Sequence, residues 1–147
     1  MVEEVYNFLL GYGFSIEHIN YIEDINENIY LVTEYHAKKI IEFLKKFDLN
    51  KIEIINIISN NPEIISQKEK NLLGLYNLYK NYVNFSDEDI KNILINKTHL
   101  FIINYKKIKL FIESLQKKSK NDNEIRQEII NLNENIWGNK KVTFFQI

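Results

Sequence analysis

Cysteine is absent from this chain of 147 residues, and the sequence has few glycines, a single proline and one arginine, Arg126. Without cysteine the chain forms no disulfide, no zinc knuckle and no thiolate centre, and a reducing compartment is permitted. None of its four glycines stands before Lys-Ser or Lys-Thr in the spacing of a phosphate-binding loop. No apolar run approaches the roughly 18 residues that a membrane-spanning helix needs. These absences exclude thiol chemistry, P-loop nucleotide binding and a membrane-spanning protein.

Metal ligands and catalytic groups are also not gathered anywhere in the sequence. His18, His36 and His99 are scattered, and none has helical spacing to a second histidine or to a pair of carboxylates suited to a metal. Acidic runs such as residues 87–89 stand at expected helix starts, where the helix dipole is sufficient reason for them. We therefore expect a protein that is not an enzyme and that uses no cofactor and no metal.

Composition and charge are those of an ordinary globular chain. Hydrophobic residues make up 45% and charged residues 27% of the sequence, close to the globular average. The formal net charge of −1 gives no overall attraction to phosphate, although a clustered basic surface is compatible with it. The amino terminus lacks the basic region of a secretory signal and the arginines of a transit peptide. We expect a cytoplasmic protein, or an organellar matrix protein after processing, without a signal peptide or transmembrane segment.

A short polar residue recurs four times at junctions along the chain. These residues, spaced 35, 36 and 35 apart, are Ser15, Asn50, Ser86 and Asn121. Such side chains accept hydrogen bonds from the free amides of a helix's first turn. An acidic residue stands at the third helical position after three of them, whereas His18 interrupts the series after the first. We predict four helix N-caps in a repeat of about 35 residues.

Apolar residues flank three of these caps in the pattern of a hydrophobic staple. The pairs are Phe14 with Ile19, Leu49 with Ile54, and Phe85 with Ile90. Because a staple sets the angle at which the chain enters a helix, its repetition predicts the same local geometry in each repeat. The helix that follows each cap, helix A, carries apolar residues at helical spacing and should run for about three turns.

A short turn is expected after each helix A. Pro62 cannot continue a helix and disfavours helical backbone at Asn61, so the helix A of the second repeat should end there. Glu27 and Thr98 occupy the equivalent places in the other repeats. An apolar pair follows each of these positions: Ile29 with Tyr30, Ile64 with Ile65, and Leu100 with Phe101. We predict that the turns place both side chains of each pair in the core.

A second helix, helix B, is predicted in each repeat from apolar residues at i, i+3, i+4 and i+7. The same pattern from Val5 to Tyr12 predicts that the chain begins with a helix B, which Gly11 and Gly13 bring to its end. The three later sets are Ile40, Phe43, Leu44 and Phe47; Leu75, Leu78, Tyr79 and Tyr82; and Ile108, Phe111, Ile112 and Leu115.

Together these elements predict an all-α fold. We expect a short α-solenoid of about 3.5 repeats, each with helix A, a short turn and helix B, and roughly seven helices in all. It should form one domain over residues 1–147, in which the apolar stretch 142–147 and Trp137 either close the C-terminal end or meet a partner. The expected parts are a first helix B (1–13), three repeats (14–48, 49–84 and 85–119) and a degenerate C-terminal cap (120–147).

The repeat resembles that of the mitochondrial transcription termination factor (mTERF) family. Repeats of that family read as a helix after a Phe/Leu-Ser-like cap, an Asn-Pro-x-Leu-Leu-like turn and a second helix. The matching stretches are 14–22, 49–65 and 85–101, and the fullest match is 49–65 with Pro62 in the turn. The resemblance implies a curved solenoid whose concave face, in many members, binds duplex DNA or structured RNA in organelle transcription or ribosome assembly. This chain has fewer repeats than the typical member, one proline and no arginine-rich face.

Lysine clusters on the B helices are the candidate contacts for nucleic acid. A regularly spaced basic stripe can follow phosphates along a strand or duplex. The alternative is the solvated face of an amphipathic helix, which Glu42, four residues from both Lys38 and Lys46, supports. The candidate residues are Lys38, Lys39, Lys45 and Lys46 on the first full helix B, and Lys106, Lys107 and Lys109 two repeats later.

Two functions of different class follow from these patterns. The first is a nucleic-acid-binding helical-repeat protein of mTERF type, which contacts duplex DNA or structured RNA by its backbone and shape. The alternative is a protein-interaction solenoid or a small subunit of a larger assembly, which the net charge near zero favours. The nine tyrosines and nine phenylalanines suggest stacking on unpaired bases, but most have core spacing, so packing explains them.

Overall fold

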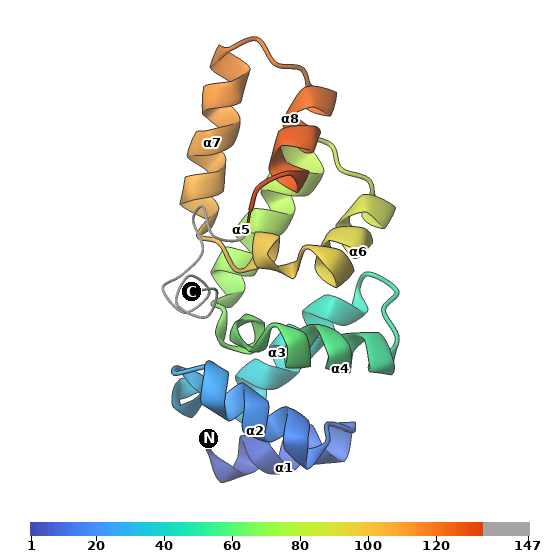
Figure 1. Cartoon of the computed structure of the whole chain (residues 1–147), viewed down its shortest axis with the longest axis vertical. Coiled ribbons are helices and arrows are strands. Elements are labelled where there is room, and N and C mark those ends of the chain that lie inside the picture. The colour runs from blue at the N-terminus through green and yellow to red at the C-terminus, as the bar shows by residue number, and fades with distance from the viewer. Residues whose placement is uncertain (134–147) are drawn as a thin grey trace. The chain divides into compact units, whose positions relative to one another are not determined.

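The computed structural model describes residues 1–133, and all of its regular structure over that range is helical (Figure 1). The chain divides into two compact units, Met1–Glu69 (unit 1) and Lys70–Ile147 (unit 2). The described residues form eight α-helices, against roughly seven expected. The predicted all-α helical-repeat fold is confirmed. The single domain stays a prediction, and Trp137 and the stretch 142–147 lie outside the described residues.

Unit 1 is built from four α-helices and two 3-10 turns. Helix α1 contacts α2 and α3, and α2 contacts α4, so that α1, α2 and α4 lie side by side in Figure 1. Turn η2 contacts α2, α3 and α4 and closes the core of the unit. In chain order the elements are α1 (Glu3–Tyr12), α2 (Ile16–Ile25), η1 (Ile29–Leu31), α3 (Glu34–Lys45), α4 (Lys51–Asn60) and η2 (Pro62–Ser66).

Unit 2 repeats this alternation around an aromatic centre. Tyr79 is fully buried and meets Phe85 and Phe101 edge to face, with ring centroids 5.9 and 5.2 Å apart. Helix α6 contacts turns η3 and η4, and α7 contacts α8. The elements are α5 (Glu69–Asn77), the π-helical turn η3 (Leu78–Tyr82), α6 (Asp87–Asn96), η4 (Thr98–Phe101), α7 (Tyr105–Lys117) and α8 (Asp122–Ile130).

All four predicted N-caps are confirmed, and each closes a full capping box. The side chains of Asn50, Ser86 and Asn121 accept from the backbone amide three residues on, and the acidic residue there accepts from the cap amide. The expectation that His18 interrupts the series was wrong. His18 Nδ1 accepts from the Ser15 amide at 3.2 Å, because an unprotonated imidazole nitrogen can serve as acceptor in place of a carboxylate.

A left-handed residue precedes each cap by two positions. Gly13 has a φ of 127°, and Asp48, Asn84 and Ser119 have φ values of 58°, 58° and 63°. In this conformation the chain ends each helix B and reverses toward the next cap. Glycine adopts it freely and Asp and Asn more readily than other residues, so the residue types themselves carried this signal.

The extra residue of the second repeat is taken up by the π-helical turn η3. Caps are spaced 35, 36 and 35 residues apart, and the longer interval contains Leu78–Tyr82. There the amide of Val83 bonds to the Leu78 carbonyl, five residues back, at 3.3 Å. A π turn holds one more residue than an α turn, so the helix accommodates the insertion without a longer loop.

The turns after the A helices form as predicted in two of three cases. Helix α4 ends at Asn60 and Pro62 opens η2, with Ile64 and Ile65 fully buried. Leu100 and Phe101 are likewise buried in η4. The prediction was wrong for Tyr30, which is 65% exposed. Turn η1 is only three residues long, so its two inward positions are Ile29 and Val32, one 3-10 turn apart.

The apolar stripes of the B helices are buried at most positions, whereas Phe8, Tyr12 and Phe111 are half-buried. In α3 and in the Val5 and Leu9 pair of α1 the predicted core positions are buried. Tyr82, expected in the core, is 45% exposed. The π turn advances the chain by one residue at this point, and Val83 takes the buried place instead.

Candidate nucleic-acid interface

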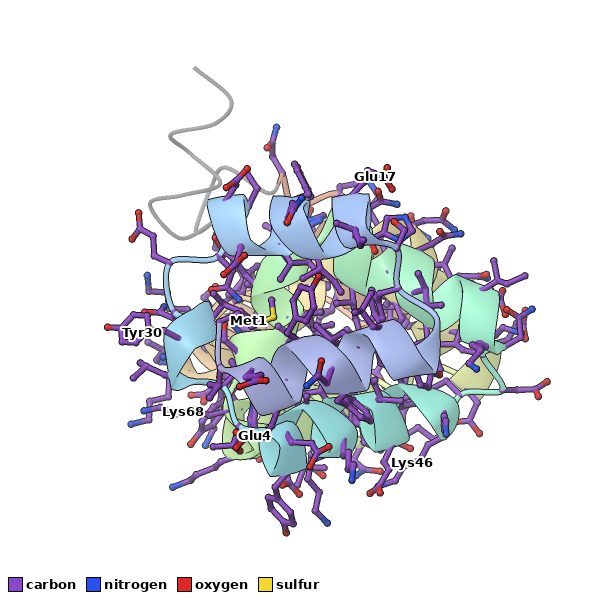
Figure 2. All side chains as sticks on the ribbon, turned by 90° about the horizontal axis from the view of Figure 1, so that it is seen from below. Met1, Glu4, Glu17, Tyr30, Lys46 and Lys68 are labelled. Carbon is purple, nitrogen blue, oxygen red and sulfur yellow. The ribbon has the colours of Figure 1, made fainter. Side chains whose placement is uncertain are left out.

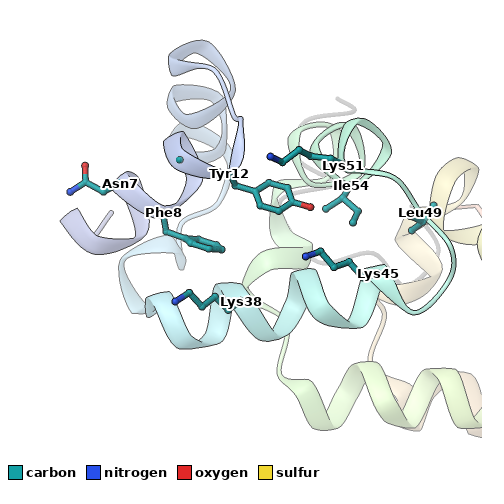
Figure 3. Close-up of a pocket in the computed structure, with 9 residues that line it drawn as sticks. Asn7, Phe8, Tyr12, Lys38, Lys45, Leu49, Lys51 and Ile54 are labelled. Carbon is teal, nitrogen blue, oxygen red and sulfur yellow. The ribbon is translucent and has the colours of Figure 1, made fainter.

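Helix α3 directs two of the predicted lysines toward α1. Lys38 and Lys45 are seven residues apart, about two helical turns, so they leave the same side of the helix. Figure 3 shows both side chains rising from α3 toward Phe8 and Tyr12. The core-facing residues form a separate stripe, Ala37, Ile40, Ile41, Phe43 and Leu44.

A groove of about 600 Å³ opens between α1, α3 and the start of α4, and we call it the basic groove (Figure 3). Its charged lining residues are Lys38, Lys45 and Lys51, and none of the described residues that line it is acidic. Three ammonium groups in one groove without a carboxylate attract an anion. The uncharged lining residues are Asn7, Phe8, Gly11, Tyr12, Leu49 and Ile54.

Aromatic rings of α1 hold the three ammonium groups at the groove. The Nζ of Lys38 lies 5.6 Å from the ring centroid of Phe8. Those of Lys45 and Lys51 lie 5.8 and 5.0 Å from the centroid of Tyr12, one below and one above the ring in Figure 3. Each such cation–π contact contributes about 0.5–1 kcal/mol at an exposed site. Burial raises the pKa of the Tyr12 phenol, so the ring stays neutral between the two charges.

The one carboxylate that meets a groove lysine is a weak partner. Lys38 Nζ lies 3.9 Å from Glu34 Oε2, with both side chains about half exposed. Exposed pairs of this kind contribute only about 0–1 kcal/mol and leave most of the charge available. Among the described residues Glu42, which the sequence suggested as a partner of Lys38 and Lys46, forms no ion pair.

Lys51 is a groove residue that was not predicted from the sequence, because the predicted contacts were lysines of the B helices. Lys51 is the first residue of α4, directly after the cap Asn50, and it reaches the groove from a helix A. The signal was present in the repeat itself: the same position holds Ile16, Asp87 and Asp122 in the other repeats. Lys51 is the only lysine that directly follows one of the four caps, which suggests a role specific to unit 1.

Two of the three equivalent positions in unit 2 hold an ion pair. Lys80 stands where Lys45 stands in unit 1, and Asp87 stands where Lys51 stands. Lys80 Nζ lies 2.9 Å from Asp87 Oδ1, so the two side chains form an ion pair. In the next repeat Asp122 accepts a hydrogen bond from Asn84 Nδ2 at 2.7 Å. Leu73 stands where Lys38 stands, so only unit 1 has lysine at all three positions.

The remaining predicted lysines lie outside the basic groove. Lys39 Nζ is 5.3 Å from the ring centroid of Tyr35, and Lys46 caps the end of α3 (Figure 2). Lys106, Lys107 and Lys109 are all exposed on α7. Counted from the caps Thr33 and Asn104, Lys109 matches Lys38 in position. These five lysines stay predicted contacts, and none of them lines the basic groove.

Metal-binding clusters and helices able to span a membrane are both absent from the described residues. No group of three or more histidine or acidic side chains there is placed to hold a metal ion. His18 serves its capping box, and His99 Nε2 lies 3.1 Å from the carbonyl oxygen of Leu132. No helix within residues 1–133 combines the length and the apolar character that crossing a membrane requires.

Comparison with known proteins agrees with the repeat pattern. The family model described as mTERF matches residues 1–127. No curated protein and no protein of solved structure shows significant similarity to the chain.

Proposed function

The chain belongs to the mTERF family, and we propose that it binds nucleic acid without catalysing a reaction, with the basic groove of unit 1 as its principal contact. Backbone phosphates are the anions that the groove attracts, and its residues recognise charge and shape. Lysine is a point charge without the bidentate fork of arginine, so the sequence preference is slight.

One observation carries this proposal: three lysines converge in one groove, whereas two of the equivalent positions in unit 2 hold the Lys80–Asp87 ion pair. The contrast between Lys45 with Lys51 and the Lys80–Asp87 ion pair supports a binding surface in unit 1, because its lysines are not paired with aspartate. Family membership supports the same ligand class.

The test is a binding titration at several salt concentrations, with three lysines changed to glutamine in each of two variants. The groove variant carries Lys38→Gln, Lys45→Gln and Lys51→Gln. The control carries Lys68→Gln, Lys70→Gln and Lys97→Gln, which removes the same charge at exposed positions outside the groove and outside the predicted contacts. Each phosphate contact contributes about 0.7–0.9 to the slope of log affinity against log salt, so the groove variant should lose about 2 to 3 in slope.

The control variant should keep the slope and affinity of the wild type to within about one contact. Equal losses in both variants would show that net charge, and not the groove, governs binding. If the wild type binds neither DNA nor RNA at low salt, the nucleic-acid proposal fails.

A second candidate function, protein interaction, is favoured by an exposed apolar cluster in unit 1. Tyr30, Leu31 and Tyr35 are 65%, 66% and 71% exposed around η1 and the start of α3, and Tyr30 projects outward in Figure 2. Loss of a copurifying partner from the Leu31→Ser, Tyr35→Ser variant, with nucleic-acid affinity unchanged, would support this function.

A further inference from the structure

The walls of the basic groove point to the form of nucleic acid that enters it. We infer, on the basis of the proposed function, that the groove takes a short stretch of unpaired nucleotides in preference to a duplex. Phosphates lie against Lys38, Lys45 and Lys51, and a base stacks on Tyr12 or Phe8.

Phe8 and Tyr12 form an aromatic wall within the groove and do not belong to the core. They stand one helical turn apart on α1, with ring centroids 6.3 Å apart and planes inclined by 38°. Both side chains are half-buried, unlike the core residues Val5 and Leu9 of the same helix. Although both rings have the spacing of core residues, each keeps part of its surface exposed at the groove.

Ring faces of this kind discriminate between paired and unpaired bases. In a duplex each base is covered by its neighbours, so only the phosphate backbone and the base edges are accessible. An unpaired base offers a free π face, and stacking on an aromatic side chain contributes about 1–3 kcal/mol per base. In a groove that tracks a duplex the rings would only position the lysines, whereas with an unpaired strand they also provide a stacking surface.

The lysines that now cover the rings do not prevent stacking. A cation–π contact at an exposed site contributes about 0.5–1 kcal/mol, less than a stacked base. When a base displaces the ammonium group, the flexible lysine remains beside the groove and moves to the phosphate of the same nucleotide. The two interactions are then made together, and the cation–π contact holds the lysine in place until the strand arrives.

Gly11 keeps the groove open next to the rings. It lines the groove between Phe8 and Tyr12, and a Cβ added to it would meet nothing within 4 Å. A large side chain at this position would fill space at the ring wall without removing a lysine or an aromatic ring. It therefore offers a test of the groove that is independent of charge.

The length of the basic groove suits a few nucleotides. Lys38 and Lys45 are about 10 Å apart along the axis of α3, from the helical rise per residue. Stacked nucleotides advance about 3.4 Å along a strand, so this span corresponds to about three phosphates.

The experiment compares a labelled oligothymidine strand and a labelled blunt duplex of the same length, by fluorescence anisotropy with the full chain. Wild type should bind the single strand more tightly than the duplex. Tyr12→Leu should weaken single-strand binding about 5- to 100-fold and weaken duplex binding less, because the stacked base is lost only from the single strand. Tyr12→Phe keeps the ring and should bind as wild type does.

Gly11→Leu serves as the second variant, with thermal unfolding of every variant measured in parallel. It should weaken single-strand binding selectively. If Tyr12→Leu lowers the melting temperature, Gly11→Leu provides the test of single-strand binding instead. Equal affinity of wild type for strand and duplex, unchanged in both variants, would overturn this inference and leave the proposed function standing. Absence of binding to both probes would overturn the two together.

Discussion

The backbone amide of Ser15 donates to Nδ1 of His18 at 3.2 Å, so an imidazole closes the first capping box of the chain. The other three boxes use Glu53, Asp89 and Glu124 at the same position. A carboxylate at this position stabilises the helix in two ways: it accepts a hydrogen bond from the cap amide, and it interacts favourably with the positive end of the helix dipole. A neutral imidazole provides only the hydrogen bond.

We expect His18→Glu to raise the free energy of unfolding by about 0.3–1 kcal/mol, because it adds the helix-dipole term to an existing capping box. Urea denaturation at neutral pH and low salt measures the change. His18→Ala is the control and should lower the stability. A destabilised His18→Glu protein would show that the contact of the imidazole with Phe14, with centroids 6.4 Å apart, matters more than the cap.

Ser119 is the left-handed residue least suited to its conformation. Its φ is 63°, and it lacks the side-chain amide or carboxylate that makes this region more accessible to Asn84 and Asp48. Left-handed backbone costs a residue with a Cβ about 1–2 kcal/mol, and glycine loses about 0.5–1 kcal/mol through its greater freedom when unfolded. We expect Ser119→Gly to stabilise the protein by up to about 1 kcal/mol. Asn84→Gly should change the midpoint of denaturation less than Ser119→Gly does.

Two helical glycines should respond in opposite ways to alanine. A Cβ at Gly11 would meet nothing within 4 Å, so Gly11→Ala should stabilise α1 by about 0.8–1 kcal/mol through helix propensity. A Cβ at Gly74 would lie 2.9 Å from Cγ of Tyr105, at the inner end of the ring, where the side chain cannot swing aside. Gly74→Ala should therefore lower the melting temperature. A rise in both variants would mean that Tyr105 is free to move.

Stability should fall at alkaline pH because of Tyr79. Burial raises the pKa of its phenol well above the ordinary value of about 10, and the hydroxyl donates to the carbonyl of Leu100. The folded state thus holds a proton that the unfolded state releases. Stability is complete below about pH 10 and declines above it by up to about 1.4 kcal/mol per pH unit.

Tyr79→Phe is the control for this pH dependence. It should cost about 1–2 kcal/mol at neutral pH, since the Leu100 carbonyl loses its donor, and it should flatten the decline above pH 10. An alkaline decline of the same steepness in Tyr79→Phe would assign the effect to other groups.

Features made by neighbours in sequence could be predicted from the sequence. The four caps, the end of helix A before Pro62 and the apolar stripes each depend on hydrogen bonds or contacts within about one helical turn, so the order of residue types contains them. The wrong burial predictions arose where the length or type of a helical turn changed which side chains face the core. Tyr30 is exposed because η1 is one turn long, and Tyr82 is exposed because a π turn shifts the helix behind it.

The sequence by itself determined the repeat, its helices and the family, because each repeat carries its own caps, stripes and turn. Only the tertiary structure decided which lysines act together. Lys38, Lys45 and Lys51 line one groove because α1, α3 and the start of α4 pack around it. Lys39 and Lys46, adjacent to two of them in sequence, do not line the groove, since each residue turns the helix by about 100°. Spacing along a chain predicts a face of one helix, whereas a site shared by three helices depends on how their faces are packed.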